Sequence, residues 1–124
     1  MKHSTSKPTK AEANRITRMM LLGCSVCAHL GLWVIAQECH HLLQGGRRLG
    51  HWYTIPLCKG HHRGEWSFLQ QKVLSQEDRV SISDGRKAFT RIYPPEKQLW
   101  IEVQHRLRLS TDWPESKILP RKTA

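Results

Sequence analysis

Acidic residues are scarce in this chain of 124 residues, where ten Asp and Glu stand against twenty Lys and Arg. The formal net charge is therefore +10. So strong a positive field favours a polyanionic partner, and nucleic acid is the partner that we predict. The basic residues are scattered along the chain and are not gathered in one amphipathic helix, which argues against binding to a membrane surface.

Long apolar runs are absent as well. None approaches the roughly 20 residues that span a bilayer, and the basic start, MKHSTSKPTK, is not followed by an apolar signal core. We therefore expect a soluble protein of the cytosol. Apolar residues make up only 39% of the chain, so a staple such as a metal ion would help a small core. Nothing resembles a linker, and we expect one domain, 1–124, with short basic tails.

Cysteine is rare, with four in the chain. Two disulfides are disfavoured in a reducing cytosol. Cys24 and Cys27 form a C-x-x-C pair, and Cys58 and His61 form a C-x-x-H pair of the same spacing. Zinc prefers four thiolate and imidazole ligands in a closed structural site. The sequence therefore predicts a structural zinc ion on these four residues, with Cys39 as the rival for the fourth position.

Turn residues and apolar spacing predict an α+β domain. Thr9 and Glu12 match a capping box at the start of the first helix. A glycine-rich loop is expected over 44–50, Pro56 is expected to end the second strand, and Asp84 to cap the third helix. The expected strands are 32–38 and 51–55, and the expected helices are 10–22, 65–74, 86–92 and 96–109.

Histidines crowd the stretch CHHLLQGGRRLGHWYTIPLCKGHHRG, residues 39–64. Neighbours on a helix project roughly 100° apart, so His61 can face the zinc while His62 faces another site. Neighbours on a strand point to opposite faces, so His40 and His41 share one site only if the chain bends there. The spacing by itself does not separate a catalytic histidine from a zinc ligand.

Three segments, "GCSVC", "ECHHL" and "PLCKGHH", resemble the motifs of the HNH nucleases. More narrowly, "RRLGHWYTIPLCKGHHRG" is similar to phage recombination-enhancement nucleases, which depend on the RecA recombinase. The resemblance covers roughly residues 20–75, and "KAFTRIYPPEKQLWIEVQHRL" agrees more loosely with the C-terminal helices of that family. It implies a zinc-stapled, treble-clef-like ββα-metal core with flanking N- and C-terminal helices. It also implies a phage or prophage DNA endonuclease or nickase in the cytosol of a bacterial host.

The resemblance implies a role for each remaining central histidine. His41 is the general base that activates water, and His40 and His62 bind a catalytic divalent ion, Mg²⁺ or Mn²⁺. These roles suit the chemistry, because a neutral imidazole accepts a proton at cellular pH and a hard cation neutralises the scissile phosphate. The family's middle asparagine has no counterpart here, and His51 and Thr54 are the candidates for steadying that loop.

Backbone phosphates are expected to contact Arg47 and Arg48 in the glycine-rich loop, and Lys59 and Arg63 around a helix start. Trp113, in the polar tail, is the tryptophan expected to be exposed and able to stack on a base. A RecA filament is a partner by resemblance only. The alternative function is a non-catalytic zinc module that binds nucleic acid, which explains charge and zinc equally well but leaves the other histidines without a purpose.

Overall fold

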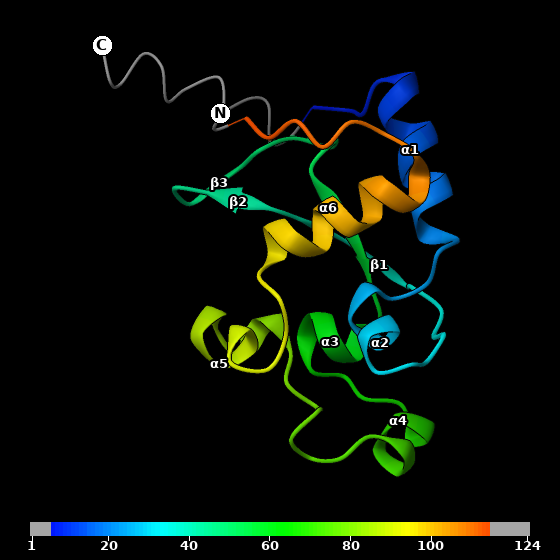
Figure 1. Cartoon of the computed structure of the whole chain (residues 1–124), viewed down its shortest axis with the longest axis vertical. Coiled ribbons are helices and arrows are strands. Elements are labelled where there is room, and N and C mark those ends of the chain that lie inside the picture. Colours follow the sequence, from blue (N-terminus) through cyan, green and yellow to red (C-terminus); the bar gives the residue numbers. More distant parts are fainter. Residues whose placement is uncertain (1–5, 115–124) are drawn as a thin grey trace.

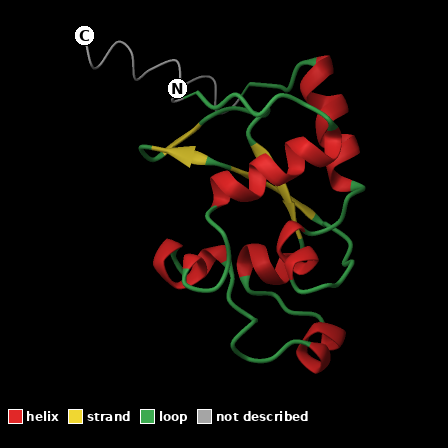
Figure 2. Cartoon of the chain, in the orientation of Figure 1, coloured by secondary structure: helices red, strands yellow, loops and turns green. Residues whose placement is uncertain are grey.

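The computed structural model describes residues 6–114, and the outer ends of the two expected tails lie outside the described residues. Figure 2 shows short strands surrounded by helices, and the predicted α+β class is confirmed. The helices are α1 (Lys10–Met20), α2 (Ser25–His29), α3 (Lys59–Arg63), α4 (Phe68–Val73), α5 (Arg86–Thr90) and α6 (Glu96–Leu107). The strands are β1 (Glu38–His41), β2 (Leu43–Gln44), β3 (Arg47–Arg48) and β4 (Thr54–Leu57).

The fold contains two small antiparallel sheets, and the one formed by β1 and β4 lies at its centre. β1 pairs with β4 in a register that runs from Glu38 opposite Leu57 to His41 opposite Thr54. β2 and β3 form a hairpin that projects beyond the end of β1, and α3 follows β4 (Figure 1). The chain therefore passes through strand, loop, strand and helix in the predicted order, with the hairpin as an addition within the loop, and it brings the start of α3 beside β1.

The core lies between this sheet and α6, which crosses α1 and β4 (Figure 1). The expected helices at the two ends are confirmed, and the first begins with the predicted capping box of Thr9 and Glu12. The apolar stripe predicted for the last helix is buried, with every member at most 5% exposed: Leu99, Trp100, Val103 and Leu107. Burying such side chains contributes roughly 1.5–3 kcal/mol each.

The prediction of a strand over 32–38 is wrong, because regular pairing begins only at Glu38. The preceding segment wraps around the first cysteine pair, where its backbone groups find partners outside any sheet. The N–H of Leu32 donates to the carbonyl of Cys27 at 3.0 Å, and the N–H of Cys24 donates to the carbonyl of Val34 at 2.8 Å.

The second predicted strand is displaced, since β4 occupies 54–57 and includes Pro56. In a two-stranded sheet each strand has one free edge. Proline has no backbone N–H, and Pro56 fits in β4 because a residue at a free edge does not have to donate a hydrogen bond to a neighbouring strand. The expected loop over 44–50 overlaps the β2–β3 hairpin, which begins at Leu43. Its turn is made by Gly45 and Gly46, whose φ angles of 61° and 78° favour glycine at both positions.

Two helix predictions need correction at their N-termini. The helix expected over 65–74 covers only 68–73, because Ser67 caps it. Leu69, which was predicted to lie on its apolar face, is 65% exposed. Asp84 does not cap α5, which begins after Gly85. The Asp84 carboxylate instead accepts the backbone N–H of Ser81 at 2.9 Å.

Trp113 is not the exposed tryptophan that its position in a polar segment predicts. It is only 9% exposed. Its ring packs at a centroid distance of 5.5 Å from Tyr53 and 5.2 Å from Trp100, both edge-on. Trp33 is 66% exposed instead. Residues 110–113 therefore pack against the core, and the ring of Trp113 covers Tyr53 and Trp100.

Arg15 of α1 is buried in the centre of the molecule, with 1% of its surface exposed. Its guanidinium donates to the side-chain oxygen of Gln104 at 2.8 Å and to the hydroxyl of Thr54 at 2.8 Å. It also donates to the Thr54 carbonyl at 3.0 Å. Burial lowers the pKa of Arg15 to about 10, so it stays charged at neutral pH. This cation joins α1, α6 and the start of β4.

Replacing Arg15 by alanine is expected to lower the free energy of unfolding by about 3 kcal/mol, because it opens a cavity and leaves the buried oxygens of Thr54 and Gln104 without a donor. Arg18→Ala is the matched control on the same helix. Arg18 is exposed and makes one hydrogen bond to the Leu107 carbonyl, so its loss is expected to cost about 1 kcal/mol or less. Urea unfolding with zinc present measures both, and equal losses would contradict the assigned role of Arg15.

Candidate active site

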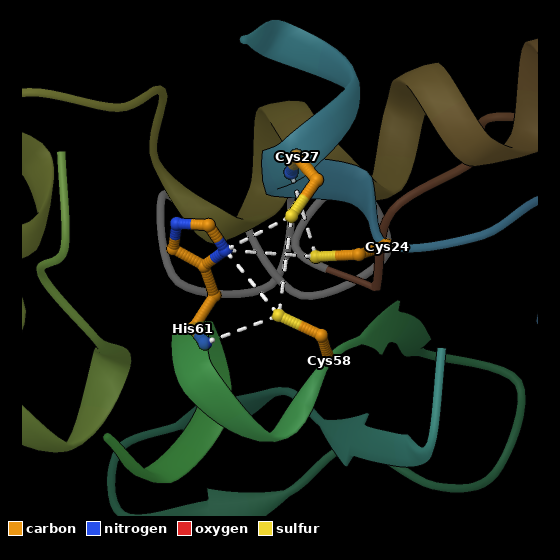
Figure 3. A group of neighbouring side chains, drawn as sticks. All are labelled: Cys24, Cys27, Cys58 and His61. Atoms are coloured by element: carbon orange, nitrogen blue, oxygen red, sulfur yellow. Dashed lines mark hydrogen bonds between the residues drawn. The ribbon is translucent and has the colours of Figure 1, made fainter. Parts of the chain in front are cut away.

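A buried cluster of three cysteines and one histidine joins α2 to the start of α3 (Figure 3). The ligand atoms of Cys24, Cys27, Cys58 and His61 all lie within 4.8 Å of one another. The Nδ1 atom of His61 lies 3.4–3.8 Å from the three sulfurs, and the sulfurs of Cys27 and Cys58 lie 4.0 Å apart. Tetrahedral zinc at ordinary bond lengths separates sulfur from nitrogen by about 3.6 Å and sulfur from sulfur by about 3.8 Å. The cluster therefore has the size of a structural zinc site.

The spacing of each pair has a local cause. Cys24 caps α2, and its sulfur accepts the N–H of Cys27 at 3.4 Å. Cys58 caps α3, and its sulfur accepts the N–H of His61 at 3.4 Å. Two residues between the ligands are needed for this bond, because an N-cap side chain accepts from the third residue after it.

Protonation in the cluster also fits a cation. The Nε2 atom of His61 lies 3.3 Å from the carbonyl of Asp78, which can only accept, so Nε2 carries a proton and Nδ1 is the nitrogen that faces the sulfurs. Hydrogen bonds with Cys24 and Cys27 lower the pKa of Cys58. Hydrogen bonds with Cys24 and Cys58 raise the pKa of Cys27. A bound cation favours deprotonation of all three thiols, because cysteine binds a metal as the thiolate.

Aromatic rings cover this cluster. Trp66 lies edge-on to His61 at a centroid distance of 4.8 Å, and Tyr93 does so at 5.5 Å. Gly60 makes the first contact possible, because a Cβ atom there would lie 2.3 Å from the Trp66 ring. Cys39, the rival fourth ligand, lies in β1 opposite Pro56 and is not among the four.

A second group of histidines lies on the other side of α3. His62 points to His40 of β1, and the Nε2 atom of His62 lies 3.2 Å from the Nδ1 atom of His40. Each ring uses its far nitrogen for a carboxylate: Nε2 of His40 lies 2.9 Å from Glu96, and Nδ1 of His62 lies 2.5 Å from Glu38. Arg63 pairs with the same Glu38. His61 and His62 therefore face different sites, as their helical spacing predicts.

Both carboxylates act as acceptors. The hydrogen bond from Arg63 is the main cause that lowers the pKa of Glu38, and the hydrogen bond from His40 is the main cause that lowers the pKa of Glu96. An ionised carboxylate accepts hydrogen bonds only, so the far nitrogens of His40 and His62 each carry a proton.

When both rings are neutral, two lone pairs face each other across 3.2 Å, because the single proton of each ring is committed to a carboxylate. This arrangement is repulsive unless a positive charge lies between the nitrogens. Ligands at about 2.1 Å from one ion are about 3.0 Å apart at a right angle and about 3.4 Å apart at a tetrahedral angle. His40 and His62 therefore fit as two neighbouring ligands of one divalent ion, each oriented by a carboxylate as metal-bound histidines commonly are.

His41 is the last residue of β1, and its ring contacts His51 instead of the His40–His62 pair. Its Nε2 atom lies 3.0 Å from the Nδ1 atom of His51. The Nε2 atom of His51 in turn lies 2.6 Å from the backbone carbonyl oxygen of Ser6. Burial is the main cause that lowers the pKa of His41 to about 4, and the nearby Arg48, His51 and His40 lower it further. The ring is neutral at pH 7, as a proton acceptor must be.

The predicted phosphate contacts divide into two groups. Arg47 and Arg48 are exposed on β3, and Lys59 is exposed at the start of α3, where its backbone N–H donates to Gln37. Arg63 is held in ion pairs with Glu38 and Glu65, so it orients the carboxylate behind His62.

A cavity of about 280 Å³ lies beside Glu96, between the β2–β3 hairpin and the starts of α5 and α6. Arg86 and Lys97 line it together with Gln44. The two basic residues were missed by sequence reasoning, since they lie far from the histidine motifs and nothing in their own segments marks them.

Two further residues were missed, the carboxylates of Glu38 and Glu96. A signal existed for Glu38, because it lies two residues before His40 on a strand and so shares its face. No such signal existed for Glu96, which the fold of α6 brings to His40 from a distant part of the chain.

Comparison with known families gives one finding that bears on this site. A family model described as "Recombination enhancement, RecA-dependent nuclease" matches residues 8–108, which include both histidine groups and the cysteine cluster. No curated protein matches the chain. Among the helices of residues 6–114, none has both the length and the apolar character needed to cross a bilayer.

Proposed function

The chain belongs to the family of recombination-enhancement, RecA-dependent nucleases, and we propose that it is an HNH-type, metal-dependent DNA endonuclease or nickase. Its zinc-stapled core supports this proposal by presenting β1 and α3 to one another. His40 and His62 bind the catalytic ion, Mg²⁺ or Mn²⁺, and His41 is the general base. We also propose that a RecA filament is the partner, that the protein originates from a phage or prophage, and that it acts in the host cytosol.

One observation supports catalysis above all others: Nδ1 of His40 and Nε2 of His62 converge, with the far nitrogens of both rings fixed by Glu96 and Glu38. Both far nitrogens contact carboxylates, so in neutral rings the two facing nitrogens are free to act as metal ligands. With only two protein ligands, the rest of the coordination shell is open to water and phosphate, as Mg²⁺ tolerates.

The chemistry is hydrolysis of a phosphodiester. A divalent ion at this position supplies positive charge to the scissile phosphate and to the leaving oxygen. His41 takes one proton from water, the water oxygen forms the new bond to phosphorus, and the bond to the leaving oxygen breaks with its electron pair. The leaving oxygen then takes a proton from solvent. Glu96 and Glu38 keep the rings of His40 and His62 in place throughout.

The DNA is expected to cross the β2–β3 hairpin and the neighbouring cavity. Arg47 and Arg48 are exposed on the hairpin, and Arg86 and Lys97 line the cavity beside Glu96. Arginine and lysine at such positions bind phosphates without reading sequence. We therefore propose little sequence specificity, and binding that weakens steeply with salt.

Cleavage of supercoiled plasmid tests the function. With Mg²⁺ or Mn²⁺ and RecA filaments, the wild type is expected to nick or linearise the plasmid. His41→Ala is expected to lower the rate by about 100-fold or more, because a positioned base contributes 10²–10⁴ to such reactions. DNA affinity, measured by fluorescence anisotropy, should stay within about twofold, since the arginines are untouched.

The matched control is His105→Ala, because His105 is exposed on α6. Its cleavage rate should equal that of the wild type. Failure of the wild type to cut DNA with either ion, with and without RecA, would favour the non-catalytic zinc module that binds nucleic acid.

A further inference from the structure

The contact between His41 and His51 differs from the contact between His40 and His62 in one respect. In the metal pair, both far nitrogens are committed to carboxylates. In the pair of His41 and His51, the far nitrogen of His51 contacts a group that can only accept a hydrogen bond. Its Nε2 atom lies 2.6 Å from the backbone carbonyl oxygen of Ser6. The rings are nearly perpendicular, at 72°, with Nε2 of His41 directed at Nδ1 of His51.

The positions of the protons follow from this difference. A carbonyl oxygen only accepts, so the single proton of a neutral His51 lies on Nε2. Its Nδ1 atom then has a lone pair and can only accept. The proton in the 3.0 Å contact must therefore belong to Nε2 of His41, which leaves Nδ1 of His41 as the basic nitrogen.

We infer that His51 is a positioning residue that fixes His41 in the Nε2–H tautomer, with the Ser6 carbonyl fixing His51. The catalytic consequence rests on the proposed nuclease function. Nδ1 of His41 takes the proton from water, and the resulting imidazolium keeps its hydrogen bond to the Nδ1 lone pair of His51. His51 therefore both selects the reacting nitrogen and stabilises the charge that forms there.

The backbone of His51 is held firmly enough for this role. Its carbonyl accepts the hydroxyl of Thr54 at 3.1 Å, and Thr54 is fully buried and held by Arg15. Tyr53 closes the turn by donating its N–H to the carbonyl of Gly50 at 3.1 Å. Both residues considered for steadying this loop thus take part: Thr54 holds the His51 backbone through its hydroxyl, and His51 acts through its ring.

Substitutions at position 51 separate the two contacts. Asparagine places an oxygen close to where Nδ1 stands, so His51→Asn retains an acceptor for His41. Glutamine places its amide close to where Nε2 stands, so His51→Gln retains the contact to Ser6 and loses the one to His41. We expect His51→Gln and His51→Ala to lower kcat about 10- to 100-fold with KM unchanged, and His51→Asn to stay within about threefold of the wild type.

Nitrogen NMR of the full, zinc-loaded chain gives a readout that does not depend on cleavage. Two-bond proton–nitrogen couplings identify the protonated nitrogen of each imidazole, and the His41→Ala spectrum assigns the His41 signals. We expect an Nε2–H tautomer for His41 in the wild type and in His51→Asn, and a mixture of tautomers in His51→Gln. An Nδ1–H tautomer in the wild type, or a doubly protonated His51, would overturn the inference.

Equal kcat values for His51→Gln and His51→Asn would also overturn the catalytic role of His51. If the wild type cut no DNA at all, the proposed nuclease function would fail, while the NMR spectrum would still decide the tautomer.

Discussion

Replacing Cys58 by serine is expected to abolish cooperative folding of the chain. Structural zinc sites bind with apparent free energies of about 10–16 kcal/mol in small zinc-finger peptides, and whole domains are stable by only about 5–15 kcal/mol. Cys58 also caps α3 and anchors His61. Loss of one ligand therefore removes a binding free energy comparable with the whole free energy of unfolding of the domain. Circular dichroism melting and zinc release measured with a chromogenic chelator test this.

Cys39→Ser is the matched control, because Cys39 is the one cysteine outside the cluster. It should retain its zinc and melt cooperatively. The wild type treated with a strong chelator should lose its thermal transition in the same way as Cys58→Ser. A Cys58→Ser protein that holds zinc and melts like the wild type would show that the cluster is not the staple of this fold.

Replacing His62 by alanine is expected to lower the cleavage rate by about 1,000-fold while leaving the fold intact. Metal catalysis contributes several kcal/mol to the transition state, and each 1.36 kcal/mol is tenfold in rate. The His62 side chain is 27% exposed, and Glu38 keeps its ion pair with Arg63 after the substitution. Plasmid cleavage over a range of Mn²⁺ concentrations is the measurement.

The melting temperature separates this effect from unfolding. His62→Ala should melt within a few degrees of the wild type, because the substitution leaves the cluster of Cys24, Cys27, Cys58 and His61 intact. A rate restored to the wild-type value by high Mn²⁺ would mean that His62 only raises metal affinity. An unchanged rate at low Mn²⁺ would contradict a metal role for His62.

The zinc cluster could be predicted from the sequence because its geometry is local. Each ligand pair is an N-cap and the third residue after it, so the spacing alone determines the contact. The directions of His61 and His62 were likewise predictable from helical periodicity, since they depend on one short helix. The choice of His61 over Cys39 followed from the same geometry, because a strand residue has no such capping position.

The carboxylate behind His40 could not be predicted. Glu96 reaches His40 only because α6 packs across β4, and that depends on the burial of Leu99 and Trp100. The burial of Trp113 could not be predicted for the same reason. Its own segment is polar and does not indicate that the ring packs against Tyr53 and Trp100. Sequence patterns within one segment predict its helix or strand. Contacts between distant segments depend on how these elements pack, which the sequence of one segment does not indicate.

Pulsed electron paramagnetic resonance of bound Mn²⁺ tests most directly whether His40 and His62 hold an exchangeable ion. With zinc already in the cysteine cluster and histidine labelled with ¹⁵N, the wild type should show coupling of Mn²⁺ to two imidazole nitrogens, and His62→Ala should show coupling to one. A spectrum without imidazole coupling, or one that His62→Ala leaves unchanged, would contradict the proposed active site.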